Sequence, residues 1–64
     1  MKEYRVTKIL REPKLEALRL DHVTIEYWSV AVVLKGNSEE YESAVTFETL
    51  KKAQQLQIGD VFLR

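Results

Sequence analysis

The chain has 64 residues, of which 45 % are hydrophobic and 31 % charged, and its formal net charge is zero. This length allows one domain with one small core, and the composition is typical neither of a disordered chain nor of a membrane-spanning one. The sequence has no cysteine and only one histidine, which excludes disulfides, cysteine zinc sites and sites with several histidines.

The first predicted strand covers residues 3–11. Its apolar side chains alternate from Tyr4 to Leu10, with Ile9 out of phase. A helix would also group some of these side chains, but Pro13 would end it early and the Val-Thr pair within the segment favours a strand. We therefore expect a strand, followed by a turn around this proline.

The segment after this turn is ambiguous from the sequence alone. Leu15 and Leu18 share a helical face, whereas Leu18 and Leu20 share a strand face. We expect a short strand at residues 16–20, with a tight connection at residues 21–22 into the next element.

The most apolar and β-branched stretch is residues 23–35, around which we expect the fold to be organised. Before Tyr27-Trp28 the odd-numbered side chains are the bulky apolar ones, and after this pair the even-numbered ones are. A β-bulge at this pair would explain the change, because one extra residue shifts the side-chain parity and bends the strand. A straight strand of this length would span about 43 Å, too long for a compact chain with a radius of gyration of about 11 Å. The stretch thus predicts a strongly bent sheet of the small-barrel kind.

A hairpin follows this stretch. Residues 35–38 have the flexible composition of a turn, and strand alternation resumes over residues 39–47. Good helix formers predict a helix at about residues 48–57. The Gly-Asp pair at 59–60 then turns the chain into a last strand at residues 61–64.

The segment Leu56-Gln-Ile-Gly-Asp-Val-Phe62 resembles the strand-entry turn of SH3-like and related small barrels, in which a Gly-Asp pair reverses the chain before an apolar strand. The resemblance covers seven residues and implies an architecture, not a function. The expected fold class is α+β, in a single domain over residues 1–64. We expect a small, strongly bent antiparallel β-sheet of SH3-like or small-barrel type, with one short helix before the C-terminal strand.

Candidate catalytic residues are few. His22 is the only imidazole, and the adjacent Asp21 would point to the opposite face of a strand and could not orient it. Glu39, Glu40 and Glu42 lie beside a turn, where a solvated acidic rim is expected. No glycine-rich phosphate loop is present. We therefore expect a non-enzyme, with no catalytic residues, no metal and no cofactor.

The second half of the 23–35 stretch is apolar on both faces, and one helix with a narrow apolar stripe can cover only part of it. We therefore predict a protein-interaction or self-assembling module, most simply a homodimer, with one face of this stretch against a second subunit or another protein. The predicted interface residues are Trp28, Val30, Val32, Val33 and Leu34. A small cytoplasmic accessory or inhibitor protein, of the kind that phages and mobile elements encode, fits this size; no membrane partner is expected.

Nucleic-acid binding is the alternative function. Small barrels bind single strands with exposed aromatic side chains beside basic ones, and the chain has Tyr4, Tyr27 and Trp28 together with Arg5, Lys8 and Arg11.

The charges are segregated along the chain. Residues 1–20 hold six basic residues against three acidic ones, whereas residues 21–48 hold six acidic residues against one basic residue. The total charge is nevertheless zero, which argues against a phosphate-binding domain. Opposite charges on neighbouring strands, or complementary patches between subunits, would explain the segregation without nucleic acid.

Overall fold

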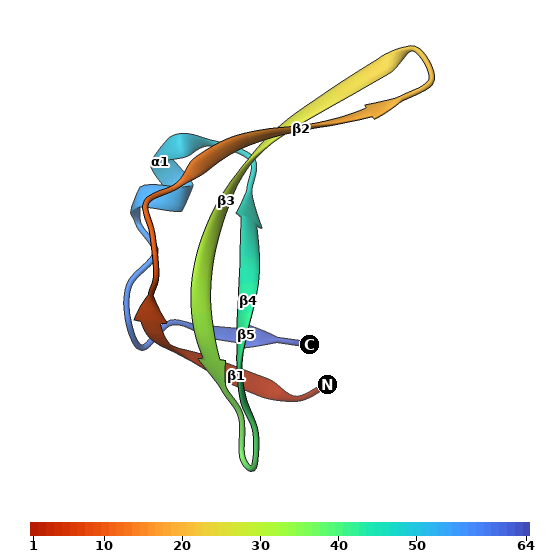
Figure 1. Cartoon of the computed structure of the whole chain (residues 1–64). Coiled ribbons are helices and arrows are strands. Elements are labelled where there is room, and N and C mark those ends of the chain that lie inside the picture. The colour runs from red at the N-terminus through yellow and green to blue at the C-terminus, as the bar shows by residue number, and fades with distance from the viewer.

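The computed structural model describes all 64 residues as one five-stranded antiparallel sheet with one short helix (Figure 1). The elements in chain order are β1 (Glu3–Ile9), β2 (Lys14–Leu20), β3 (Val23–Lys35), β4 (Glu40–Phe47), α1 (Leu50–Gln54) and β5 (Val61–Leu63). The predicted antiparallel sheet and the short helix before the last strand are confirmed. The strand expected at residues 16–20 is present and begins two residues earlier, whereas the helix is shorter than the predicted span of 48–57.

β3 is the centre of the sheet. Trp28 and Ser29 each pair with β2 and with β4, so these two strands lie on opposite edges of β3. β1 pairs with the end of β3, from Val32 to Lys35, on the same edge as β2, and β5 pairs with β1. β4 and β5 are not paired with each other, so the sheet is not closed into a barrel.

The hairpin formed by β2 and the first half of β3 projects from the rest of the molecule (Figure 1). We call residues 14–27 the arm and the remaining residues the body. Asp21 turns the chain at the tip of the arm with a φ of 47°, in the left-handed region that Asp tolerates better than most residues. The projection gives the molecule extents of 41 × 22 × 15 Å. Its radius of gyration is 12.9 Å, against about 10.7 Å for a compact chain of this length.

The predicted β-bulge at Tyr27-Trp28 is wrong. β3 pairs with β2 and with β4 without any shift in register, so it bends as one continuous strand (Figure 1). The bulge lies in β1 instead, where the register with β3 shifts between Val6 and Lys8. The extra residue brings Ile9 to the side of the sheet that Val6 faces, which explains why Ile9 is out of phase in the sequence.

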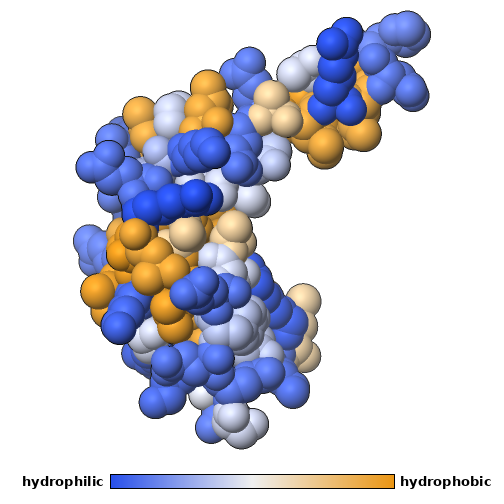
Figure 2. All heavy atoms as spheres, viewed as in Figure 1, coloured by the Kyte–Doolittle hydropathy of each residue, from blue (hydrophilic) through white to orange (hydrophobic).

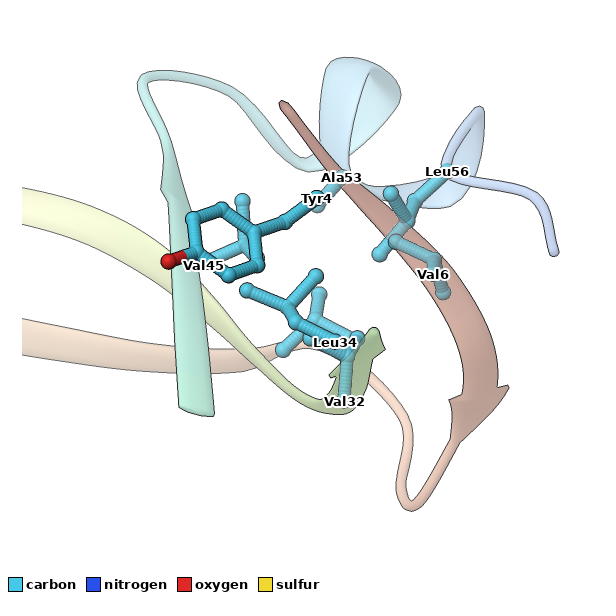
Figure 3. Close-up of a cluster of buried hydrophobic side chains, with 8 residues drawn as sticks. Tyr4, Val6, Val32, Leu34, Val45, Ala53 and Leu56 are labelled. Atoms are coloured by element: carbon cyan, nitrogen blue, oxygen red, sulfur yellow. The ribbon is translucent and has the colours of Figure 1, made fainter. Parts of the chain in front are cut away.

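The core lies on one side of the body, where the even-numbered side chains of β3 point. It combines residues from β1, β3, β4 and α1 with one residue from the loop after the helix (Figure 3). Its members are Tyr4, Val6, Val30, Val32, Leu34, Val45, Ala53 and Leu56. Full burial of an aliphatic side chain of this size contributes about 1.5–3 kcal/mol, so this single cluster stabilises the body.

α1 covers the core because its short apolar stripe faces the sheet. Thr49 caps the helix, with its Oγ1 accepting a hydrogen bond of 3.2 Å from the backbone N–H of Lys52. Ala53 and, just after the helix, Leu56 are buried. Gly59 then turns the chain toward β5 with a φ of 101°, in the left-handed region that favours glycine.

Tyr4 closes the end of the core beside the turn between β3 and β4. Its hydroxyl donates a hydrogen bond of 2.7 Å to Glu39 Oε1, and its ring packs edge-to-face on Tyr41 with the ring centroids 5.5 Å apart. The hydrogen bond to the Glu39 carboxylate, together with burial, raises the pKa of Tyr4 above its usual value of 10.0. A Cβ at Gly36 would stand 2.8 Å from Tyr4 Cε1, so the turn needs glycine at this position.

Candidate interaction surfaces

The arm has one hydrophobic face that has no partner in the chain. Antiparallel pairing sets Leu18 opposite Ile25, and the next such pair is Leu20 and Val23. Directly paired residues lie on the same face of a sheet, and these four side chains are 46–58 % exposed. Tyr27 continues this face toward the body, where it is paired with Glu16, and both residues are half-buried. We call the four aliphatic residues and Tyr27 the arm face; Figure 2 shows hydrophobic surface along one side of the projecting arm.

The opposite face of the arm is mostly polar. The residues paired there are Arg19 with Thr24 and Ala17 with Glu26, followed at the base of the arm by the half-exposed Leu15 with Trp28. The turn at residues 21–22 is also polar and exposed. A strand pair with one polar and one apolar face is typical of a surface sheet whose apolar side packs against another layer. No element of this chain provides that layer for the arm.

The arm also has an unpaired backbone edge. β4 ends at Phe47, opposite Trp28, so residues 23–27 of β3 have a neighbouring strand only on the β2 side. A hairpin of two strands is at best marginally stable in water unless a further strand or layer covers it. Contact with a partner would therefore stabilise the arm.

An apolar groove opens at the base of the arm. It lies between α1 and the segment that links β1 to β2, and its volume is about 740 Å³. The linking segment is held in place by the backbone N–H of Leu10, which donates to Ala31 O at 2.8 Å. We call this surface the groove; its apolar lining includes Ile9, Leu10, Pro13, Trp28, Leu50 and Leu56, and its polar lining includes Arg11 and Glu12.

The arm face and the groove lie on opposite sides of β3. The arm face uses odd-numbered residues of this strand such as Ile25, whereas the groove is lined by the even-numbered Trp28 and Val30. Successive side chains of a strand point to opposite faces. The arm face therefore cannot reach the groove of its own chain without disrupting the pairing of β2 with β3.

Three of the predicted interface residues are fully buried in the chain's own core, namely Val30, Val32 and Leu34. Other side chains of the same chain cover them, although Val30 also borders the floor of the groove. Trp28 is partly buried and lines the groove. Val33 is half-buried on the outer face of the sheet, between Lys8 and Glu42 on the neighbouring strands.

The arm face is a candidate interaction surface that the sequence pattern alone does not reveal. The strand alternation of Leu18 with Leu20, and of Val23 with Ile25, is visible in the sequence. Alternation shows which side chains share a face. It does not show that this face has no covering layer.

The candidate nucleic-acid-binding residues do not form one surface. Tyr4 is buried in the core. Arg5 and Lys8 are exposed on the outer face of the sheet, whereas Arg11 lines the groove. The aromatic pair at residues 27–28 points to opposite sides of β3. A single strand of nucleic acid would not contact these aromatic and basic side chains together.

The titratable side chains form no metal-binding group. His22 is exposed at the tip of the arm, and no three His, Asp or Glu side chains gather where they could hold a metal ion.

The chain's one helix has five residues, too few to cross a membrane. No family model, curated protein or solved structure matches the chain. The arm face and the groove are therefore the two candidate sites of interaction.

Proposed function

We propose that this protein is a non-catalytic protein-interaction module that acts through the arm face. The observation that supports the proposal is a row of half-exposed aliphatic side chains on an arm that no other element covers: Leu18, Leu20, Val23 and Ile25. Burial of apolar surface is favourable by about 25 cal/mol for each Å². Contact with a partner that buries these side chains would therefore stabilise the arm.

A protein surface suits the arm face better than a membrane or a nucleic acid does. Aliphatic side chains in rows on paired strands are how two β-layers pack in a protein interior. The charges around this face have mixed signs, with Arg19 and Glu26 on the back of the arm and Asp21 at its tip. Lipid headgroups and phosphates bind to uniformly basic surfaces, which the arm does not present.

The exposure of the arm face can be tested with anilinonaphthalene sulfonate, a dye that fluoresces on accessible apolar surface. At low micromolar concentration, a variant with Leu18→Ser and Ile25→Ser should enhance the dye less than the wild-type chain does, with an unchanged circular dichroism spectrum. Thr24→Ser, on the polar face of the arm, is the matched control and should retain the wild-type signal. Unchanged dye fluorescence together with a loss of stability as large as that of a core substitution would contradict the proposal.

Nucleic-acid binding is tested separately. By fluorescence anisotropy, we expect no salt-dependent affinity for single- or double-stranded DNA or RNA at physiological ionic strength, because the chain has no net positive charge. Binding that weakens steeply with salt, and that is lost when Arg5→Ala, Lys8→Ala and Arg11→Ala are combined, would replace the protein-interaction proposal.

A further inference from the structure

We infer that the partner of the arm face is a second copy of this chain, whose groove receives the arm, so that two copies exchange arms reciprocally. This inference rests on the proposed function and names its partner. Each copy has an uncovered apolar arm and an uncovered apolar groove, and the two cannot meet within one chain because they lie on opposite sides of β3. In a pair of copies, each arm lies on the groove of the other.

The total surface of the chain supports a contact of this size. The solvent-accessible surface is 5109 Å², whereas a compact monomer of 7.5 kDa exposes about 4,250 Å². The excess of about 850 Å² is close to the 800 Å² that each partner buries in a stable interface of standard size. One interface of standard size therefore matches the excess.

The arm face by itself is too small to provide this area. Two arms stacked face to face would bury five side chains from each copy and would leave the groove open. An arm seated on the groove buries both surfaces in the same contact. A twofold axis produces two identical arm–groove contacts and closes the assembly, so that no further copies are added.

The chemistry of the two surfaces is complementary. Aliphatic side chains of the arm face meet the aliphatic and indole side chains of the groove, with Leu10 and Trp28 among them. The groove has one charge of each sign, Arg11 and Glu12, and Arg11 is the group that could pair with an acidic side chain of the arm, Glu16 or Asp21. The net charge of zero means that two copies do not repel each other at neutral pH.

Two charge substitutions separate the halves of this contact. Ile25→Glu places a carboxylate in the arm face, and Leu10→Glu places one in the groove. Both native side chains are nearly half exposed in the free chain, Ile25 by 46 % and Leu10 by 45 %, so circular dichroism and melting at low micromolar concentration should show folded monomers. In sedimentation equilibrium at high micromolar concentration, the wild-type chain should be a dimer. Each variant alone should dissociate, with its dissociation constant raised more than about 10-fold.

The decisive measurement is an equal mixture of the two variants. A heterodimer should form, because the intact arm of the Leu10→Glu copy can lie on the intact groove of the Ile25→Glu copy. Isotopic labelling of one variant allows native mass spectrometry to distinguish the heterodimer from homodimers. The heterodimer retains one of two contacts, so it should be weaker than the wild-type dimer and stronger than either variant homodimer.

Two controls add the same charge away from the contact. Thr24→Glu lies on the polar face of the arm, and Gln57→Glu lies on the exposed loop after α1. Both should remain dimers with wild-type affinity. If either test variant fails to fold, Ile25→Ser and Leu10→Ser measure the same contact with a milder change.

The other outcomes distinguish this inference from the proposed function. A wild-type dimer that Leu10→Glu does not weaken, with no recovery in the mixture, would establish arm-to-arm contact and overturn the exchange, while the arm face remained an interaction surface. A wild-type chain that is monomeric at every accessible concentration, with its arm face open to the dye, would assign the surface to a different protein. A monomer whose arm face excludes the dye would remove both proposals.

Discussion

The two halves of β3 follow the same rule of alternation and end in opposite environments. In the body, Val32 and Leu34 are 0 % exposed, because β1, β4 and α1 all reach this half of the strand. In the arm, Val23 and Ile25 are about half exposed, because β2 is the only neighbour. The compared side chains are all aliphatic in both halves, so residue type does not explain the difference. The difference in burial follows from the number of elements that reach each half of the strand.

The largest expected effect comes from changing adjacent residues of the body half to glutamate. Val32→Glu buries an unpaired carboxylate in the core, which should unfold the chain, since a domain of this length has a total stability of about 3–10 kcal/mol. Val33→Glu places the carboxylate on the outer face between Lys8 and Glu42, where attraction and repulsion largely offset each other, and should cost about 1 kcal/mol or less. Circular dichroism and urea denaturation measure both. Similar losses for the two variants would contradict the observed division between the buried and outer faces.

A smaller effect separates the body from the arm directly. Leu34→Ala should destabilise the monomer by about 2–5 kcal/mol, because it leaves a cavity in the core. Leu18→Ala should change the stability by about 1 kcal/mol or less at low micromolar concentration, because about half of its side chain is already exposed in the free chain. Urea unfolding monitored by tryptophan fluorescence compares the two. Equal losses would mean that the arm belongs to the same cooperative core as the body.

The smallest effect concerns the pH dependence of stability. It arises at Tyr4, which lies at the end of the core beside the turn between β3 and β4. The folded-state pKa of Tyr4 is raised above 10.0 by its hydrogen bond to Glu39 and by burial. The folded state therefore keeps this proton where the unfolded state loses it. The stability from this group is fully present below pH 10 and should decline as the pH rises through the folded-state pKa.

Tyr4→Phe should remove this pH dependence. The difference in urea midpoint between the wild-type chain and the variant should be constant between pH 7 and pH 9, within the range where Tyr4 is protonated in both states, and should shrink above it. A difference that grows above pH 10 would contradict the assigned role of the hydrogen bond.

Most of the individual elements can be predicted from local patterns. The turn at 21–22, the hairpin after β3 and the Gly-Asp turn before β5 follow from alternation and turn chemistry, whereas the pattern at residues 16–20 allows a helix as well as the strand that forms. The irregular position of Ile9 is also visible in the sequence, and a bulge in β1 produces it. The arm face is less predictable, because alternation does not show whether a face is covered.

The change of apolar side near Trp28 has two physical explanations that give the same sequence pattern. One is a bulge, which would keep the whole of β3 in one core. The other is a continuous strand whose first half has lost the neighbours that cover its second half, which is what the structure contains. A local pattern cannot separate the two, because they differ only in which distant segments reach the strand.

Which side chains share a face follows from local patterns in the sequence, since alternation is a local property of the extended backbone. Which of these faces are covered follows only from the fold. β1, β4 and α1 come from both ends of the chain and converge on the second half of β3, whereas the arm extends beyond the end of β4 at Phe47. Burial depends on contacts between segments far apart in the sequence, which is why Leu34 is in the core and Ile25 is on the surface.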